Sequence, residues 1–131
     1  MTDQLISFET AKLAKEKEFL EPTINLYDIS NRGIWQDEQL FMGDKSSYDE
    51  KIDLFAPTQS LLQRWLREKH GIHIYIKTTP SFDEIQGNKW KSSIKYSFKS
   101  FKWTTGHYYL GNTYEEVLEQ GLQEALKLIE V

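Results

Sequence analysis

The sequence of 131 residues contains no cysteine, which excludes disulfide bonds, a thiol nucleophile and any zinc or iron–sulfur site held by cysteine ligands. It has no apolar run near the roughly 18 residues that a membrane span needs, so we expect no membrane partner. The start Met1-Thr2-Asp3-Gln4 has neither the basic residues nor the apolar stretch of a secretory signal. These absences predict a cytoplasmic protein.

Motifs that carry catalysis or hold phosphate are also missing. The sequence has no G-x-S-x-G turn to present a nucleophilic serine. It has neither G-x-x-x-x-G-K-[ST] nor G-x-G-x-x-G, whose glycines let a backbone approach a phosphate. We therefore expect no catalytic residues and no cofactor, and we favour a non-enzymatic role while leaving an enzyme open.

Two groups of residues contain side chains that commonly bind metal ions. His70 and His73 have the i, i+3 spacing that can hold zinc on a helix, but Gly71 breaks the helix between them, so a structural role is favoured. An acidic loop contains Asp44, Asp49, Glu50 and Asp53 without the regular spacing of a calcium loop. We expect no metal, and only a pocket joining His107 to this loop would favour a hydrolase or metal enzyme.

The remaining composition, 39% hydrophobic and 27% charged residues, is that of a globular protein, and the length predicts a single domain over residues 1–131. We predict an α+β fold in the order α-β-β-α-β-β-α, with helices on one face of a mainly antiparallel sheet. The expected elements are a helix from Ser7 to before Pro22, a hairpin over 23–29 and 34–42, a loop over 43–56, a helix over 58–70, strands over 72–77 and 91–100, a turn over 104–106, a short strand over 107–110 and a helix over 113–129.

The two central strands alternate strictly between apolar and polar residues. Period-two alternation places one set under the helices and the other set on the open face. We expect Ile72, Ile74, Ile76, Ile94, Tyr96 and Phe98 to be buried. We expect the lysines opposite them to be staggered against serines or to meet Asp83 or Glu84, because like charges directly opposite destabilise a sheet.

A basic block interrupts this acidic chain. Residues 69–103 carry seven lysines against Asp83 and Glu84, a net charge of +5, whereas the whole chain carries -4. Lysines that alternate with aromatic residues suit single-stranded nucleic acid, although the low pI of 5.4 argues against dominant phosphate binding. The candidate nucleic-acid surface consists of His73, Tyr75, Lys77, Lys91, Lys95 and Lys99.

The chain is also rich in aromatic residues, with 4 Trp, 7 Tyr and 7 Phe. This exceeds the need of one small core, so some rings should be exposed and mark a contact with an unknown protein partner or a second copy of the chain. The candidates are Trp35, Phe41, Trp90, Trp103, Tyr108 and Tyr109.

Three segments resemble a known group of sequences. They are Ser7 to Lys17, Pro57 to Glu68 with the following Ile72-His73-Ile74, and Thr113 to Ile129. Together they resemble short phage- and prophage-encoded proteins of gut bacteria to which no activity is assigned. The group typically has glycine where this chain has Glu18.

The resemblance implies an origin in a mobile element and a small cytoplasmic accessory role. Our first functional hypothesis is therefore a non-enzymatic phage or prophage accessory protein that acts as a protein-interaction module. The alternative is a nucleic-acid-binding protein that uses its lysine-rich open sheet face.

Overall fold

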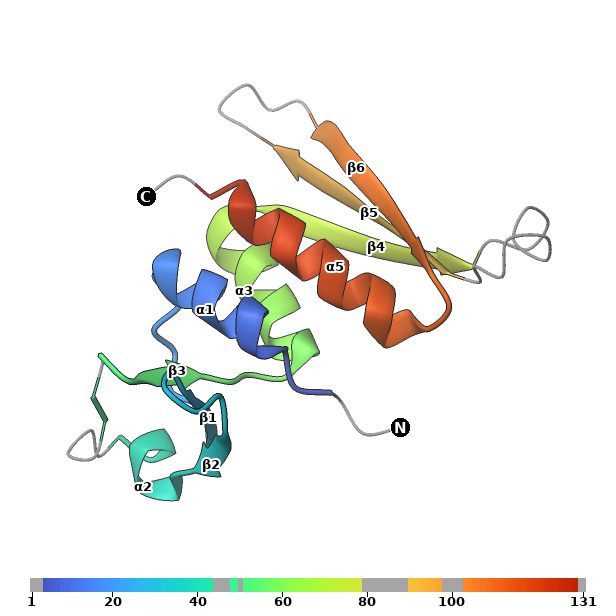
Figure 1. Ribbon diagram of the computed structural model, residues 1–131. Coiled ribbons are helices and arrows are strands. Elements are labelled where there is room, and N and C mark those ends of the chain that lie inside the picture. The colour runs from blue at the N-terminus through green and yellow to red at the C-terminus, as the bar shows by residue number, and fades with distance from the viewer. Residues whose placement is uncertain (1–3, 44–47, 50, 79–89, 98–102, 130–131) are drawn as a thin grey trace. The chain divides into compact units, whose positions relative to one another are not determined.

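The computed structural model divides the chain into two compact units, one formed by Met1–Thr58 with Glu130–Val131 and the other by Gln59–Ile129 (Figure 1). It describes residues 4–43, 48–49, 51–78, 90–97 and 103–129; for 39, 40, 78, 91, 95–97 and 103–109 only the backbone is described. The α+β class and the antiparallel pairing are confirmed. The strands form two three-stranded sheets, one in each unit, where one sheet was expected.

Unit 1, the N-terminal unit, is built around a short antiparallel sheet. The central strand β1 pairs with β2 on one side and with β3 on the other, so the expected hairpin is present. A short helix and a third strand were missed, since both lie in segments predicted as the return strand and the loop. The elements are α1 (Phe8–Glu16), β1 (Asn25–Asp28), β2 (Ile34–Gln36), α2 (Glu38–Phe41) and β3 (Asp53–Phe55).

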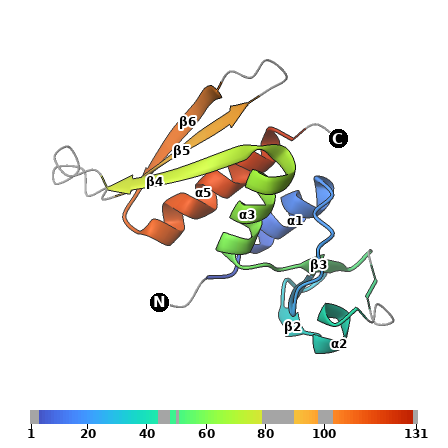
Figure 2. The ribbon, with the colours of Figure 1, turned by 180° about the vertical axis from the view of Figure 1, so that it is seen from behind.

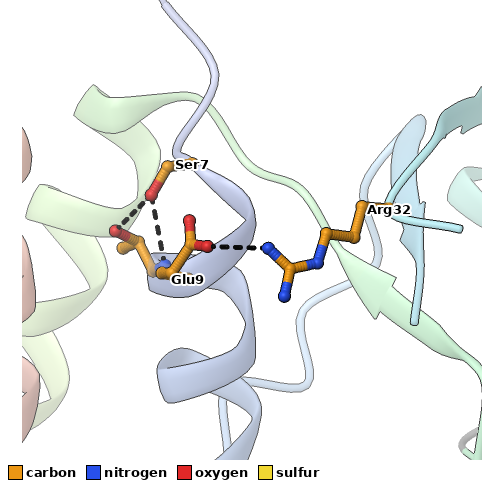
Figure 3. Close-up of polar contacts among 4 residues, drawn as sticks. Ser7, Glu9 and Arg32 are labelled. Carbon is orange, nitrogen blue, oxygen red and sulfur yellow. Dashed lines mark hydrogen bonds and ion pairs between the residues drawn. The ribbon is translucent and has the colours of Figure 1, made fainter. Parts of the chain in front are cut away.

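Helix α1 begins at the predicted N-cap. The Ser7 hydroxyl accepts a hydrogen bond from the Thr10 N–H, one of the donors that the first turn leaves without a helical acceptor (Figure 3). The helix is held to the sheet by Tyr27, whose hydroxyl donates to the Ile6 carbonyl at 2.7 Å and whose ring meets the Phe8 ring edge-on at 5.7 Å.

The C-terminal end of α1 is a Schellman motif. The Phe19 N–H donates to the Ala14 carbonyl at 2.9 Å, and the Glu18 N–H donates to the Lys15 carbonyl at 3.1 Å. Glu18 itself has φ of 66°, in the left-handed region that favours glycine. Phe19 is buried beyond the motif, so its burial holds Glu18 in a strained conformation.

Arg32 joins the β1–β2 turn to the first turn of α1. Its guanidinium lies 3.3 Å from the Glu9 carboxylate and 4.9 Å from the centre of the Phe8 ring (Figure 3). Both charged side chains of the ion pair are largely exposed, so their contribution to stability is small, about 0–1 kcal/mol.

Unit 2 is a three-stranded sheet covered by two helices. The strands follow each other in the order β4-β5-β6, so the predicted neighbours over 72–77 and 91–100 do pair. The expected turn over 104–106 is wrong, because these residues lie within β6, where Thr104 and Thr105 pair with β5. The elements are α3 (Gln59–His70), β4 (Ile72–Thr78), β5 (Trp90–Ser97), β6 (Trp103–Gly111) and α5 (Tyr114–Lys127).

The core of unit 2 lies between the sheet and these helices. Ile72, Ile74 and Ile94 are buried as predicted, and Ile76 is half-buried. Helix α5 packs against all three strands and α3 packs against β4 (Figure 2). The buried helix positions include Leu62, Leu66, Leu118, Leu122 and Ala125. For Tyr96 and Phe98 the side chains lie outside the described part.

Gly121 sets how closely α5 approaches the sheet. A Cβ atom at this position would lie 3.0 Å from Ile74 Cγ2 and 3.5 Å from Ser92 Oγ. Ser92 is fully buried, and its hydroxyl has no hydrogen-bond partner within the described part of the chain. The small volume of the Ser92 side chain, rather than its polarity, therefore suits this position under α5.

Two glutamines of α3 fasten it to its neighbours. The buried Gln59 amide donates to the Glu115 carbonyl and to the Glu119 carboxylate, both at 3.0 Å. The Gln63 amide donates to the Ile74 carbonyl at 3.1 Å. These three bonds satisfy backbone or carboxylate acceptors that would otherwise lose their hydration on burial.

The predicted helix boundaries of unit 2 are confirmed. The Thr113 hydroxyl accepts from the Glu116 N–H at 3.1 Å, which caps α5. The Glu116 carboxylate accepts from the N–H of Asn112. In a standard capping box this return bond goes to the N-cap residue itself, whereas here it goes to the residue before the N-cap. Gly71 has φ of 65° and allows α3 to turn into β4 with one intervening residue.

No helix in the described ranges is long and apolar enough to cross a membrane.

Candidate nucleic-acid interface

Strand β4 carries three polar residues on the face of the sheet opposite to its buried isoleucines. Tyr75 is 42% exposed, Lys77 is exposed and His73 is half-buried. Helices α3 and α5 lie against the other face, since Ile72 and Ile74 are buried beneath them (Figure 2). The predicted orientation of β4 is therefore confirmed.

The pairing of β4 with β5 adds further basic residues to this face. Lys77 is directly opposite Lys91, His73 is opposite Lys95, and Tyr75 is opposite Ser93. We refer to these residues of β4, together with Lys91 and Lys95 by register, as the basic sheet face. The remaining candidate, Lys99, falls outside the described ranges.

The expectation that the lysines would be staggered against serines is wrong for Lys77. The register is set by the buried side, where Ile74 pairs with Ile94, and a shift by one residue would expose these isoleucines. This requirement brings Lys77 and Lys91 together. Asp83 and Glu84, the acids proposed to meet the lysines, belong to residues that the structure does not describe.

Carboxylates are absent from the strands of this sheet. Strands β4, β5 and β6 contain Lys77, Lys91 and Lys95 but no aspartate or glutamate. The ion pairs found among the described residues join Arg32 to Glu9 and Lys127 to Glu124, and neither involves Lys77. Two like charges directly opposite each other destabilise a sheet, so this arrangement works against the stability of unit 2.

An aromatic pair lies beside the charges. The rings of His73 and Tyr75 are nearly parallel, with an interplanar angle of 16° and centroids 6.3 Å apart. The neighbour of Tyr75 across the strands is the small Ser93. This part of the sheet thus places two aromatic rings next to the exposed Lys77.

The residues predicted for a protein interface are divided between the two units. In unit 1, Trp35 is half-buried opposite Leu26 and Phe41 is 52% exposed at the end of α2. In unit 2, Trp90 is half-buried and meets the Tyr114 ring edge-on at 5.5 Å. The other three, Trp103, Tyr108 and Tyr109, lie in β6, where only the backbone is described.

The exposed aliphatic residues of unit 1 are not among the predicted interface residues, which are all aromatic. Met42 is 82% exposed, and the Ile29 N–H donates to the Ile52 carbonyl, so these two exposed isoleucines are neighbours. The sequence feature that could have indicated them is a single apolar residue within a polar turn, such as Ile29 before Ser30-Asn31. The large exposed apolar residues of unit 1 are Leu20, Ile24, Ile29, Ile34, Phe41, Met42 and Ile52.

The acids of the 43–56 segment serve the backbone. The Asp53 carboxylate accepts from the Asp49 N–H at 2.8 Å, and the Asp49 carboxylate accepts from the Lys51 N–H at 2.9 Å. No three histidine, aspartate or glutamate side chains gather into a possible metal site within the described ranges. Asp44, Glu50 and the His107 side chain lie beyond the described part.

His70 lies at the C-terminal end of α3, as expected for a structural histidine. Its ring meets the Trp65 ring at 4.7 Å, with an interplanar angle of 67°. Desolvation by this partial burial lowers the pKa of His70. His70 precedes and His73 follows Gly71, and only His73 belongs to the basic sheet face.

No protein-family model, no curated protein and no solved structure matches the chain.

Proposed function

We propose that this chain is a non-enzymatic accessory protein that binds nucleic acid through the basic sheet face. The observation that supports this proposal is the direct pairing of Lys77 with Lys91 in a sheet whose strands contain no carboxylate. A bound phosphate near the two lysines would turn their repulsion into attraction. The phage or prophage origin implied by the resemblance is consistent with such a role.

The spacing of the charges favours a polyanion over a small anion. The pairs Lys77/Lys91 and His73/Lys95 are four residues apart along β4, which corresponds to about 13 Å in a β-strand. A single phosphate cannot contact both pairs, whereas the repeated phosphates of a nucleic acid can follow the strand.

The acidic pI of the chain does not oppose this function once the two units are counted separately. Unit 1 contains six Lys and Arg against thirteen Asp and Glu, a net charge of -7. Unit 2 contains ten against seven, a net charge of +3. The positive charge is thus local to the unit that carries the basic sheet face, and local potential governs anion binding.

The test is a titration of labelled 20-nucleotide single strands and duplexes with the full chain over a range of salt concentrations. We expect Lys77→Gln to weaken binding roughly three- to tenfold at low salt and to reduce the log–log salt slope by about 0.7–0.9. Lys12→Gln is the matched control, because it removes the same charge from an exposed position of α1 in unit 1. Absence of binding at micromolar protein, or equal effects of the two variants, would overturn the proposal.

A second candidate function is binding to a protein partner or to a second copy through unit 1. The observation that favours it is the position of the exposed apolar residues. Of the nine large hydrophobic residues that are exposed in the described part of the chain, all but Tyr75 and Tyr114 belong to unit 1. Such a concentration is typical of contact surfaces.

This candidate is tested by light scattering for self-association and by affinity capture from host lysate. The double variant Phe41→Ser/Met42→Ser removes two exposed apolar side chains, so it should abolish the contact and leave the thermal unfolding temperature unchanged. A monomer that captures the same proteins with and without these substitutions would exclude unit 1 as the contact surface.

A further inference from the structure

We infer that strand β2 is a docking edge for a second copy of this chain, which pairs with it in the antiparallel direction about a two-fold axis at Trp35. The contact joins the three-stranded sheets of two copies of unit 1 into one continuous sheet. This inference rests on the second candidate function, contact through unit 1, and specifies its partner and its contact surface. The basic sheet face takes no part in it.

The outer edge of β2 carries backbone groups that the sheet of unit 1 does not use (Figure 1). The Asp28 N–H donates to the Gly33 carbonyl, so these two residues form a hydrogen-bonded pair between the chain segments of β1 and β2. Such pairs alternate in an antiparallel ladder, so the N–H and C=O groups of Ile34 and Gln36 point away from β1. Both residues are exposed, and neither has a backbone hydrogen bond on this side within the described ranges. The edge is therefore open to another strand.

The opposite edge of the same sheet, formed by β3, is occupied. The Asp53 N–H donates to the Asp49 carbonyl at 2.8 Å, and the Asp53 carbonyl accepts from the Lys15 ammonium group at 3.2 Å. Sheet edges are commonly protected by such coverage, or by a proline or a charged residue on the edge strand. Strand β2 has the sequence Ile-Trp-Gln and contains neither. The difference between the two edges indicates that β2 is kept available for pairing.

A second copy of β2 fits this edge because the outward groups have the required spacing. With the axis at Trp35, Ile34 of each copy lies directly opposite Gln36 of the other. Both residues direct their N–H and C=O groups outward, so each of these pairs can form both of its hydrogen bonds. A register shifted by one residue would instead oppose groups that already bond to β1. The edge is thus complementary to itself in one register.

The apolar side chains across the sheet support the same axis. Phe55, Leu26 and Trp35 are directly opposite one another on the three strands and share one face. Phe55 and Leu26 are buried, whereas Trp35, at the open edge, is only half-buried. The axis places the two Trp35 residues in a pair without backbone hydrogen bonds, where opposed side chains come closest. Aromatic pairs across strands stabilise a sheet, so the row continues favourably into the second copy.

The charges at the two ends of β2 favour the antiparallel direction. Arg32 precedes the strand and Glu38 follows it, and both are exposed. Antiparallel pairing brings the Arg32 end of each copy to the Glu38 end of the other. The ion pair of Arg32 with Glu9 leaves the arginine side chain 67% exposed, so a further carboxylate can reach it. Opposite charges then meet at both ends, which selects this partner and this orientation.

The axis is tested by cross-linking, because the chain has no cysteine of its own. Trp35→Cys in the full chain places the thiols of two copies in a pair with a Cα separation of about 4.5 Å, which suits a disulfide. With oxidised glutathione we expect a covalent dimer. Met42→Cys is the control, because it carries an 82% exposed side chain of the same unit, and it should cross-link roughly tenfold more slowly or less. Equal rates for the two variants would overturn the inference.

The reversible dimer is measured by sedimentation equilibrium, which also covers the case that Trp35→Cys does not fold. A contact between three-residue strands is small, so we expect a weak dimer that dissociates on dilution. Gln36→Pro removes an outward donor without removing a bond to β1, and it should raise the dissociation constant roughly 5- to 150-fold. Ile34→Lys should also weaken the dimer. Its matched control is Ile52→Lys, which adds the same charge at a 45% exposed isoleucine beside β3.

The outcomes separate this inference from both proposed functions. A chain that stays monomeric up to about 1 mM would overturn it. If Phe41→Ser/Met42→Ser dissociates the dimer and Gln36→Pro does not, contact through unit 1 holds but β2 is not its surface. If Lys77→Gln dissociates the dimer, the contact uses the basic sheet face and the inference is wrong. Thermal unfolding of each variant, measured at a concentration where the chain is monomeric, provides the folding control.

Discussion

Each unit contains two like-charged residues directly opposite each other on neighbouring strands. In unit 1 the pair is Asp28 and Asp53, and in unit 2 it is Lys77 and Lys91. Both pairs work against sheet stability, since like charges at directly opposed positions repel. The two units differ in what surrounds these charges.

The carboxylates of unit 1 are used within the molecule. Asp28 accepts hydrogen bonds from the N–H and the hydroxyl of Ser30, at 2.8 and 2.5 Å, and from the Asn31 N–H. These hydrogen bonds lower the pKa of Asp28. Asp53 accepts from the Asp49 N–H. Each charge thus fixes a local turn, which accounts for the pair structurally.

For Lys77 no comparable internal partner is found within the described ranges. The strands around it contain no carboxylate, and the ion pairs of the described residues do not include Lys77. A like-charge pair in a sheet therefore indicates a role in binding only if local hydrogen bonds do not already account for its charges. Where the charges hold turns, the pair is structural; where they do not, the proposed ligand would account for it.

The largest expected effect comes from Lys77→Glu, which places an acid opposite Lys91. Nucleic-acid affinity should fall on the order of 100-fold, because the new carboxylate repels phosphate. The thermal unfolding temperature should rise by roughly 1–5 °C, since a like-charge pair becomes an opposite-charge pair. Fluorescence anisotropy and calorimetry measure the two effects. A variant that loses both binding and stability would show that Lys77 is structural.

The corresponding change in unit 1 should have the opposite effect on stability. Asp53→Ala removes the repulsion from Asp28, but it also removes the charged acceptor of the partly buried hydrogen bond from the Asp49 N–H. We expect a loss of about 1–3 kcal/mol in the free energy of unfolding, measured with urea. Asp53→Asn retains an acceptor oxygen and should lose less. Stabilisation by Asp53→Ala would remove the distinction between the two pairs.

The residues that follow α1 and α3 allow two opposite substitutions to be compared, one that introduces glycine and one that removes it. Glu18 after α1 and Gly71 after α3 have nearly equal φ values of 66° and 65°. Glu18→Gly should therefore stabilise unit 1 by about 1 kcal/mol, and Gly71→Ala should destabilise unit 2 by about the same amount. Urea unfolding of both variants measures this. Equal signs for the two changes would show that left-handed strain is not the cause.

The smallest expected effects concern pH. The folded-state pKa values of Asp28 and His70 are both lowered, so the unfolded state binds more protons and stability falls as the pH is reduced. For His70 this loss begins below its ordinary pKa of 6.5, and for Asp28 below 3.8. His70→Gln should flatten the first part of the unfolding temperature–pH curve and Asp28→Asn the second. An unchanged curve in either variant would contradict the assignment.

Local features of the fold could be predicted from the sequence. The N-caps Ser7 and Thr113, the turn at Gly71 and the buried side of β4 all depend on residues within a few positions of each other. Interactions between residues this close in sequence depend on side-chain type and spacing, so the sequence pattern is sufficient to predict them.

Features that depend on distant partners could not be predicted. Strand β3 has three residues and includes the buried Asp53, so it reads as part of an acidic loop until its pairing with β1 is known. The opposition of Lys77 and Lys91 follows from Ile74 meeting Ile94, which no local pattern specifies. The sequence therefore predicted the members of the basic sheet face, but not the pairing that makes it informative.

The buried amide of Gln59 also has a consequence for the order in which unit 2 can assemble during synthesis. Its acceptors on Glu115 and Glu119 are 56 and 60 residues further along the chain. The nascent chain must therefore carry α3 and the segments of the three strands before α5 exists to cover them. Throughout this interval the side of α3 that packs against α5 has no permanent cover, and only β4 is available to the rest of its apolar surface. A delay in the docking of α5 should therefore lengthen the time during which the newborn chain is vulnerable to aggregation.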